Sequence, residues 1–262
     1  MAIFKRIFLL FKNYIIAIVC CIYLFTLGIF NTKHRGFLSQ ICLFFGFVKS
    51  KSIIPKINFS QATSENIEIQ LRELSLKDGN ISTTELVIIN KLIKAKNPKT
   101  LFEIGTFDGR STLNMAANST EGARVYTLDI KQQNLNSTKL RIEPGDRSFI
   151  DKEEIGRRYK GSDYEKKITQ LYGDSAMFDF SPYYNSIDFV FIDGSHSYEY
   201  ALNDSRKALK LLRNGKGVIL WHDYGSPTWP GVTKALEELF LLTSDFKGLK
   251  YIEGTSLVCL IV

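Results

Sequence analysis

Two kinds of apolar pattern alternate along the chain from Ser82 onward, and this alternation restricts the fold more than any other feature. Short apolar runs have the length of buried strands, and the segments between them carry apolar residues at helical spacing. Alternation of this kind is typical of a parallel, doubly wound α/β sheet with helices on both faces. The expected strands are Thr100–Ile104, Arg124–Ile130, Ile168–Tyr172, Ile187–Ile192 and Gly217–Trp221.

Helix signals fill the gaps between these runs. Ser82 and Glu85 have the spacing of a capping box, which predicts a helix that leads into the first strand. Further helices are expected at Arg110–Asn118, Tyr198–Arg213 and Gly231–Leu242. The closing residues LKYIEGTSLVCLIV predict an antiparallel hairpin at the sheet edge, which completes a mostly parallel, seven-stranded sheet.

The first 56 residues differ from the rest of the chain. Tyr14–Phe30 is an uncharged apolar run of 17 residues, at the short end of the ~17 to 25 needed to cross a bilayer. No small-residue cleavage site follows it, which disfavours a cleaved signal peptide. The sequence therefore predicts a membrane anchor with a basic linker at 1–56 and a catalytic domain at 57–262. An excess of basic residues after the run predicts a membrane-anchored protein whose domain faces the cytoplasm.

Charge argues against a nucleic-acid partner. The net charge is +7, but the first 56 residues hold eight Lys or Arg and no Asp or Glu, which leaves 26 basic and 27 acidic residues beyond them. The expected domain is thus nearly neutral and shows no interleaving of aromatic and basic residues. The four cysteines have no paired spacing, so neither a disulfide framework nor a zinc site is expected.

A long polar segment, 131–167, interrupts the strand and helix pattern. Pro144, Gly145 and Gly161 break any regular structure within it. Loops of this length inside a compact domain are usually lids, binding loops or disordered segments. We expect an insertion or lid.

The stretch LFEIGTFDGRS places an acid and two glycines at the end of the first strand. In doubly wound sheets the turn at this position binds nucleotide-like ligands, and glycines such as Gly105 and Gly109 let the backbone approach them. The dinucleotide fingerprint is absent because Phe107 stands where its second glycine would be. Glu103 would repel phosphates, and Asp129 ends the second strand where an acid can accept ribose hydroxyls. These features predict a nucleoside ligand without phosphates.

EIGTFDGRST resembles the first motif of class I S-adenosylmethionine-dependent methyltransferases, in the form found in catechol-type and macrolide O-methyltransferases (methyltransferase family 24). VYTLDI, YGDS, FIDGSHSYEY and GVILWHDY are similar to the family's later motifs. The resemblance covers roughly 82–262 and implies a Rossmann-like fold that binds S-adenosylmethionine. It implies cofactor-binding residues at Glu103, Gly105, Thr106, Gly109, Ser111, Asp129, Asp174 and Ser175.

The chemistry is expected where the fourth and fifth strands end. Asp193, His196 and His222 are the candidate catalytic residues, because a neutral imidazole can take a hydroxyl proton at pH 7. The resemblance also implies a divalent metal ion at Asp193 and Asp223, while His222 beside them argues for base chemistry or for a softer metal. The metal-dependent and metal-free mechanisms both stay open.

The predicted function is S-adenosylmethionine-dependent O-methylation of a sugar or other small-molecule hydroxyl at the membrane surface. A saccharide or a lipid-linked acceptor suits this reading. Two alternatives come from other classes of protein. One is a nicotinamide-dependent oxidoreductase, which the missing fingerprint disfavours, and the other is a non-catalytic membrane scaffold. Oligomeric state is not predicted.

Overall fold

The computed structural model describes residues 2–31, 34, 38, 41, 52–63, 66–150 and 154–262. The chain divides into two compact units, Met1–Lys51 and Ser52–Val262. Each unit is described by itself below.

The smaller unit contains helix α1 (Ala2–Phe25), followed by the 3₁₀ helix η1 (Leu27–Phe30). The α-helix thus ends inside the apolar run Tyr14–Phe30. At 1.5 Å per residue, the uncharged helical part from Tyr14 to Phe25 spans only about 18 Å of a ~30 Å hydrocarbon core. Within the described residues, no helix is both long enough and apolar enough to cross a membrane. The predicted membrane helix and the predicted membrane-anchored localisation are therefore wrong.

The larger unit is built on one mixed sheet, with eight strands among the described residues, in the order β1-β7-β8-β6-β5-β2-β3-β4. All neighbouring pairs are parallel except β6–β8 and β7–β8. From β2 the chain first builds the sheet to one side, through β3 and β4, and then continues on the other side of β2 with β5 and β6. The carboxyl ends of β2 and β5 therefore form the topological switch point, where open α/β sheets bind ligands. The strands are β1 (Lys56–Ile57), β2 (Thr100–Ile104), β3 (Arg124–Asp129), β4 (Ile168–Tyr172), β5 (Phe189–Ile192), β6 (Val218–Trp221), β7 (Lys250–Ile252) and β8 (Val258–Ile261).

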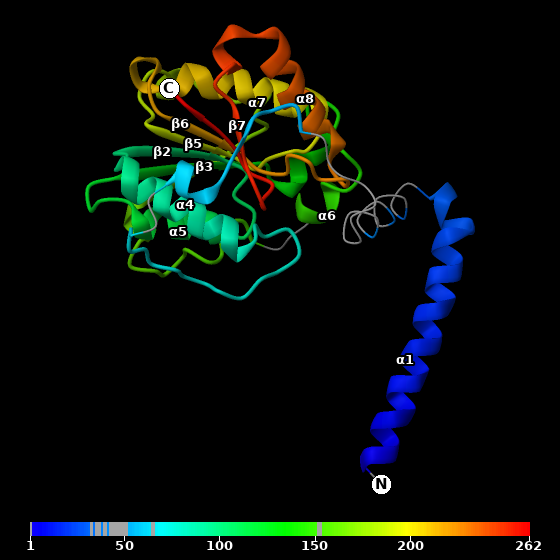
Figure 1. The fold of residues 1–262 in the computed structure, drawn as a ribbon. Coiled ribbons are helices and arrows are strands. Elements are labelled where there is room, and N and C mark those ends of the chain that lie inside the picture. Colours follow the sequence, from blue (N-terminus) through cyan, green and yellow to red (C-terminus); the bar gives the residue numbers. More distant parts are fainter. Residues whose placement is uncertain are drawn as a thin grey trace. The chain divides into compact units, whose positions relative to one another are not determined.

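Helices cover both faces of this sheet. Figure 1 shows α4 (Thr83–Lys96) and α5 (Arg110–Asn118) on one face, and α7 (Tyr198–Leu211) and α8 (Pro230–Leu242) on the other. Each pair of helices buries its own apolar cluster against the strands. The predicted doubly wound, Rossmann-like α/β fold is confirmed. The short elements are α3 (Phe59–Ala62), α6 (Arg147–Ile150) and the 3₁₀ helices η2 (Gln132–Ser137), η3 (Glu165–Lys167), η4 (Ser181–Tyr183), η5 (Arg213–Gly215) and η6 (Ser244–Phe246).

The sheet departs from the predicted one at its β7 edge. The expected hairpin forms from β7 and β8, but β8 pairs with β6, and β1 adds a parallel strand outside β7. In the described part of the chain, the sheet therefore has eight strands and not seven, and β1 rather than the hairpin forms this edge. Residues 52–56, expected in the linker, are part of the larger unit. Ile54 is buried in its core, and the Ser52 hydroxyl lies 2.8 Å from the Tyr224 hydroxyl.

The polar segment 131–167 contains η2, α6 and η3 in its described part, and it contacts the loop that follows β2. The backbone N–H groups of Gly156 and Arg158 donate to the carbonyls of Phe107 and Asp108, each at 2.9 Å. The Arg158 guanidinium also pairs with the Asp108 carboxylate at 2.7 Å. This segment therefore lies against the carboxyl edge of the sheet, next to the switch point.

Candidate functional site

The turn after β2 packs directly against the turn after β5. Gly105 has φ +97°, and a Cβ atom there would lie 2.0 Å from the Asp193 carbonyl oxygen. Gly109 is the N-cap residue of α5 and has φ +84°, and a Cβ atom there would lie 2.8 Å from the Gly156 Cα. Both positions therefore require glycine because other backbone segments approach them closely. The approaching segments are the turn after β5 and the insertion, whereas the sequence predicted that a ligand would approach these glycines.

Glu103 is fully buried at the end of β2. Its carboxylate accepts hydrogen bonds from the hydroxyls of Ser111 (2.5 Å), Thr127 (2.6 Å) and Thr112. Burial raises the pKa of Glu103 to about 7, although the three hydroxyls act in the opposite direction. Glu103 and Ser111 thus form an internal network that fixes α5 against β2 and β3, and neither lines the pocket described next.

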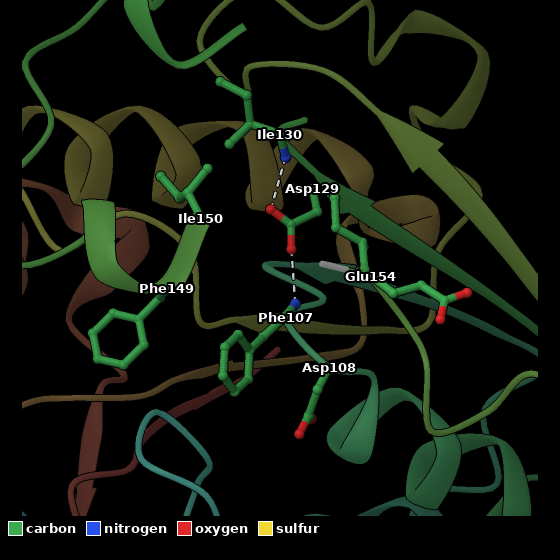
Figure 2. A pocket seen from close by; sticks show the side chains of 8 residues that line it. Phe107, Asp108, Asp129, Ile130, Phe149, Ile150 and Glu154 are labelled. Atoms are coloured by element: carbon green, nitrogen blue, oxygen red, sulfur yellow. Dashed lines mark hydrogen bonds between the residues drawn. The ribbon is translucent and has the colours of Figure 1, made fainter. Parts of the chain in front are cut away.

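Asp129 ends β3 and lines a pocket at the carboxyl edge of the sheet (Figure 2). Its Oδ2 accepts the backbone N–H groups of Thr106 (3.0 Å) and Phe107 (2.7 Å), and its Oδ1 accepts that of Ile130 (2.7 Å). Since a carboxylate offers about four acceptor positions, one remains for a ligand. Thr106 itself points elsewhere, because its hydroxyl pairs with that of Thr127 at 2.6 Å.

The pocket combines aromatic and aliphatic walls with carboxylates. It holds about 270 Å³, part of it open to solvent, and is lined by Phe107, Asp108, Asp129, Ile130, Phe149, Ile150, Glu154 and Ile155. The last four come from segment 131–167, so this insertion forms one wall. A site with apolar walls and a few acceptors suits a ring system bearing hydroxyl groups.

Asp174 and Ser175 follow β4 and do not line this pocket. The Asp174 carboxylate accepts the Lys139 and Ala176 N–H groups, each at 2.8 Å, and the Tyr200 hydroxyl at 2.7 Å. It therefore joins the insertion to helix α7. The predicted cofactor-binding residues thus divide into one at the pocket, Asp129, and others that hold its surroundings in place.

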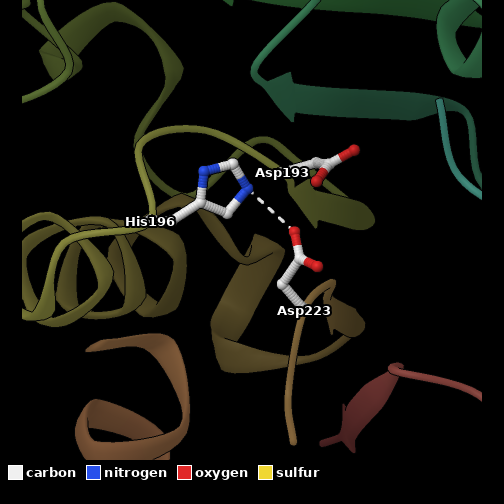
Figure 3. Close-up of side chains that lie close together, drawn as sticks. All are labelled: Asp193, His196 and Asp223. Atoms are coloured by element: carbon white, nitrogen blue, oxygen red, sulfur yellow. Dashed lines mark ion pairs between the residues drawn. The ribbon is translucent and has the colours of Figure 1, made fainter. Parts of the chain in front are cut away.

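Three of the four residues expected to carry the chemistry lie together at the ends of β5 and β6 (Figure 3). Asp193, His196 and Asp223 each offer one atom that could bind a metal ion, and these atoms lie within 4.8 Å of one another. His196 Nε2 is 2.8 Å from Asp223 Oδ2. The fourth residue, His222, places its Nδ1 3.0 Å from Asp193 Oδ1 and 3.1 Å from Asp223 Oδ2. The structure therefore brings both histidines and both aspartates into one cluster.

Each histidine has a further acid behind it. Asp146 Oδ1 lies 2.5 Å from His196 Nδ1, and Glu85 Oε2 lies 3.3 Å from His222 Nε2. The sequence indicated neither role. Glu85 carried only a capping-box signal, and Asp146 lies in the aperiodic insertion beside residues that read as helix breakers.

Neighbouring acids raise the pKa of both rings. Burial lowers the pKa of His196, but hydrogen bonds to Asp146 and Asp223 outweigh this and raise it to about 10. Burial likewise lowers the pKa of His222, and Asp193 and Asp223 raise it well above its usual value. Burial raises the pKa of Asp223, yet the two rings hold it well below its usual range. In this arrangement neither ring is the neutral base expected from the sequence.

The cluster also fits a divalent cation. Two carboxylates and an imidazole with their donor atoms close together form a ligand set that suits Mn²⁺, Fe²⁺ or Zn²⁺ better than Mg²⁺. A bound cation competes with the protons on the ring nitrogens, so its binding would release them. Asp223 has φ +65°, a conformation that costs about 1–3 kcal/mol and is common at functional sites.

Comparison with known proteins finds a family model and similar proteins. Residues 102–224 match a family model described as a methyltransferase domain. A putative caffeoyl-CoA O-methyltransferase from Arabidopsis thaliana is 28% identical over 208 residues, which are 74% of this chain and 81% of the plant protein. An uncharacterized protein of Acanthamoeba polyphaga mimivirus is 30% identical over 160 residues, which are 60% of this chain and 64% of the viral protein.

Two solved structures are similar to this chain at low identity. The O-methyltransferase from Bacillus cereus in complex with SAH is 18% identical, with a TM-score of 0.49 over 71% of this chain and 84% of that protein. The O-methyltransferase TomG from Streptomyces achromogenes, involved in tomaymycin synthesis and in complex with SAM, is also 18% identical. Its TM-score is 0.48 over 85% of this chain and 96% of TomG.

Proposed function

Because this chain is a methyltransferase, as its motifs predicted, we propose that it transfers the methyl group of S-adenosylmethionine to a hydroxyl oxygen of a small-molecule acceptor. One observation carries the proposal. A pocket suited to a nucleoside and a cluster of histidines and acids lie at the same edge of the sheet, and both border the switch point between β2 and β5.

The pocket is the proposed site of the adenosine moiety. Phe107, Ile130 and Phe149 supply faces against which a purine packs, and Asp129 keeps one acceptor position for a ribose hydroxyl. The pocket lies beside Asp129, the proposed ribose acceptor, so we assign it to the nucleoside and not to the whole cofactor. The methionine part would therefore extend past Gly105 towards Asp193, because these two turns touch.

The cluster of Asp193, His196, His222 and Asp223 is the proposed reaction site. Bound beside it, S-adenosylmethionine supplies a methyl carbon that forms a bond to the acceptor oxygen while the C–S bond pair stays on sulfur. The hydroxyl proton must pass to a base, and because both rings of the cluster are already protonated, a ring nitrogen can accept it only after it has lost its own proton. A cation at Asp193 and Asp223 would lower the pKa of a coordinated hydroxyl and would also free a ring nitrogen.

An aromatic wall borders the proposed reaction site. The Trp229 ring stacks on His196 with centroids 4.1 Å apart, and Phe149 meets Trp229 edge-on at 6.3 Å. Such a wall suits an acceptor that carries its hydroxyl on a ring, such as a phenol or a sugar. We therefore place ring-borne hydroxyls first among the acceptors.

The proposal is tested with methyl-labelled S-adenosylmethionine and a panel of acceptors that includes caffeoyl-CoA, a catechol and a reducing sugar. We expect label in the product of at least one acceptor, and loss of transfer in His196→Ala. Transfer to no hydroxyl compound, combined with transfer to an amine or thiol control, would contradict the O-methyltransferase assignment.

A further inference from the structure

Asp146 lies in the insertion, immediately before α6 and far along the chain from the motifs of the site. Among the described residues, the hydrogen-bond partners of its carboxylate all belong to the loop after β5. Oδ2 accepts from the Ser195 hydroxyl at 2.7 Å and from the His196 backbone N–H at 3.1 Å, and Oδ1 lies 2.5 Å from His196 Nδ1. The residue is nearly fully buried, with 3% exposure. Its hydrogen bonds thus serve this loop and the ring.

We propose that Asp146 is a positioning residue that keeps a proton on His196 Nδ1 and directs Nε2 to the reaction site. This inference rests on the proposed function, because it assigns the reacting nitrogen of the same cluster. Both ring nitrogens face an acid, Nδ1 facing Asp146 at 2.5 Å and Nε2 facing Asp223 at 2.8 Å. Because Asp146 is buried behind the ring while Asp223 belongs to the cluster at the reaction site, the proton that the ring exchanges there is the one on Nε2. A carboxylate behind a reacting or metal-binding histidine fixes both the tautomer and the orientation of the ring.

The surroundings of Asp146 hold the ring in the remaining directions. Trp229 covers one face of His196, with an interplanar angle of 16°. Gly145 lets the insertion lie against the Trp229 ring, since a Cβ atom there would be 2.4 Å from the Trp229 Cη2. The insertion therefore fixes His196 directly through Asp146 and indirectly through Trp229.

Glu85 provides a comparison within the same cluster. Its carboxylate also lies behind a histidine, but it caps α4 at Ser82 and accepts the N–H and hydroxyl of Ser256, each at 2.8 Å. Replacing Glu85 would therefore disturb a helix and the loop after β7. Asp146 is the better test of positioning, because its side chain has no such second task among the contacts described.

The substitution Asp146→Asn gives a sharp test because it keeps the shape and removes one acceptor. The His196 backbone N–H cannot become an acceptor, so the amide oxygen must face it and the amide NH₂ must face Nδ1. The ring then accepts at Nδ1 and carries its proton on Nε2, where it blocks both proton uptake and metal coordination. Ser195→Ala is the matched control, since it removes a partner of the same carboxylate and leaves both contacts to His196.

The first measurement is proton NMR of the ring N–H groups in the full-length protein, which has only three histidines. A short, charge-assisted Nδ1–H bond gives a far-downfield signal. We expect this signal in the wild type and in Ser195→Ala, and its loss in Asp146→Asn and in His196→Gln. The second measurement is methyl transfer to the best acceptor of the panel, where Asp146→Asn should lower kcat about 100-fold with little change in KM.

The outcomes separate this inference from the function on which it rests. If the signal persists in Asp146→Asn, or if it is lost while kcat stays at the wild-type value, the positioning role is overturned. If the wild type transfers no methyl group, the proposed function fails, while the signal still reports whether Asp146 sets the tautomer. Equal loss of kcat in Ser195→Ala would show that the carboxylate only anchors the insertion, and would also overturn the proposal.

Discussion

Gly105→Ala should destabilise the protein more than Gly161→Ala or Gly122→Ala. The new Cβ atom would lie 2.0 Å from the Asp193 carbonyl oxygen and 2.9 Å from the Gly194 nitrogen. These atoms belong to the backbone, which cannot swing aside as a side chain can. The turns after β2 and β5 would have to separate, which strains the hydrogen bond from the Asp193 N–H to the Ile104 carbonyl at 2.8 Å.

Substitutions at two other glycines separate the backbone cost of a positive φ from the cost of overpacking. Gly161 has φ +72° and open space around its Cβ position, so Gly161→Ala has only the backbone cost of about 1–2 kcal/mol. Gly122 has open space and no positive φ, so Gly122→Ala should be neutral or stabilising by about 0.4–1 kcal/mol. Gly105→Ala adds overpacking of about 1–3 kcal/mol to the backbone cost, which gives a total of roughly 2–5 kcal/mol.

The assay is urea unfolding of the full-length protein followed by tryptophan fluorescence, with the slope compared among the variants. We expect the free energy of unfolding to fall in the order Gly122→Ala, Gly161→Ala, Gly105→Ala. A Gly105→Ala protein as stable as Gly161→Ala would refute the close approach of the two turns. A loss of cofactor affinity in Gly105→Ala without any loss of stability would show that the glycine serves the ligand instead.

Three further predictions concern single groups of the site. Burial raises the pKa of Glu103 to about 7, so the wild type should lose about 3 kcal/mol of stability relative to Glu103→Gln as pH rises from about 4.5 to 7.5. Urea unfolding at the two pH values checks this, and a difference that is independent of pH would contradict it. Asp129→Asn should weaken binding of S-adenosylhomocysteine about 10- to 150-fold, measured by calorimetry, because a charged acceptor is lost; unchanged affinity would remove Asp129 from the site. If a cation takes part, chelation should abolish methyl transfer, and added Mn²⁺ should restore it in the wild type but not in Asp223→Asn. Full activity after chelation would favour the metal-free mechanism.

Local signals predicted most of the sheet and its helices. The bounds of three elements match the expected ranges: β2 at Thr100–Ile104, α5 at Arg110–Asn118 and β4 at Ile168–Tyr172. Ser82 forms the expected capping box with Glu85. These elements lie in continuous stretches whose apolar spacing and capping residues act over a few positions, so their structure is encoded locally.

Strand β1 and the end of α1 could not be predicted in this way. Lys56–Ile57 is too short to show a periodicity, and it becomes a strand only because it pairs with Tyr251 and Ile252 at the other end of the chain. The apolar run Tyr14–Phe30 reads as one helix in the sequence. In the structure a turn at Thr26 separates α1 from a 3₁₀ helix.

The candidate site was predicted in part, for a physical reason. Asp129, Asp193, His196 and Asp223 stand at or just after strand ends, and the carboxyl ends of parallel strands gather at one edge. Asp146 follows no strand, and only tertiary structure brings it to His196. The sequence also indicated a neutral histidine, because it contained no sign of the acid that would lie behind each ring.

The central claim is that the pocket at Asp129 binds an S-adenosyl nucleoside, and isothermal titration of the full-length protein tests it most directly. The protein would be titrated with S-adenosylmethionine, with S-adenosylhomocysteine and with NADH, and the first two titrations repeated with Asp129→Asn. We expect binding of both S-adenosyl compounds with a stoichiometry near one, weaker binding by the variant, and no heat from NADH. Binding of NADH, or no binding of either S-adenosyl compound, would contradict the account.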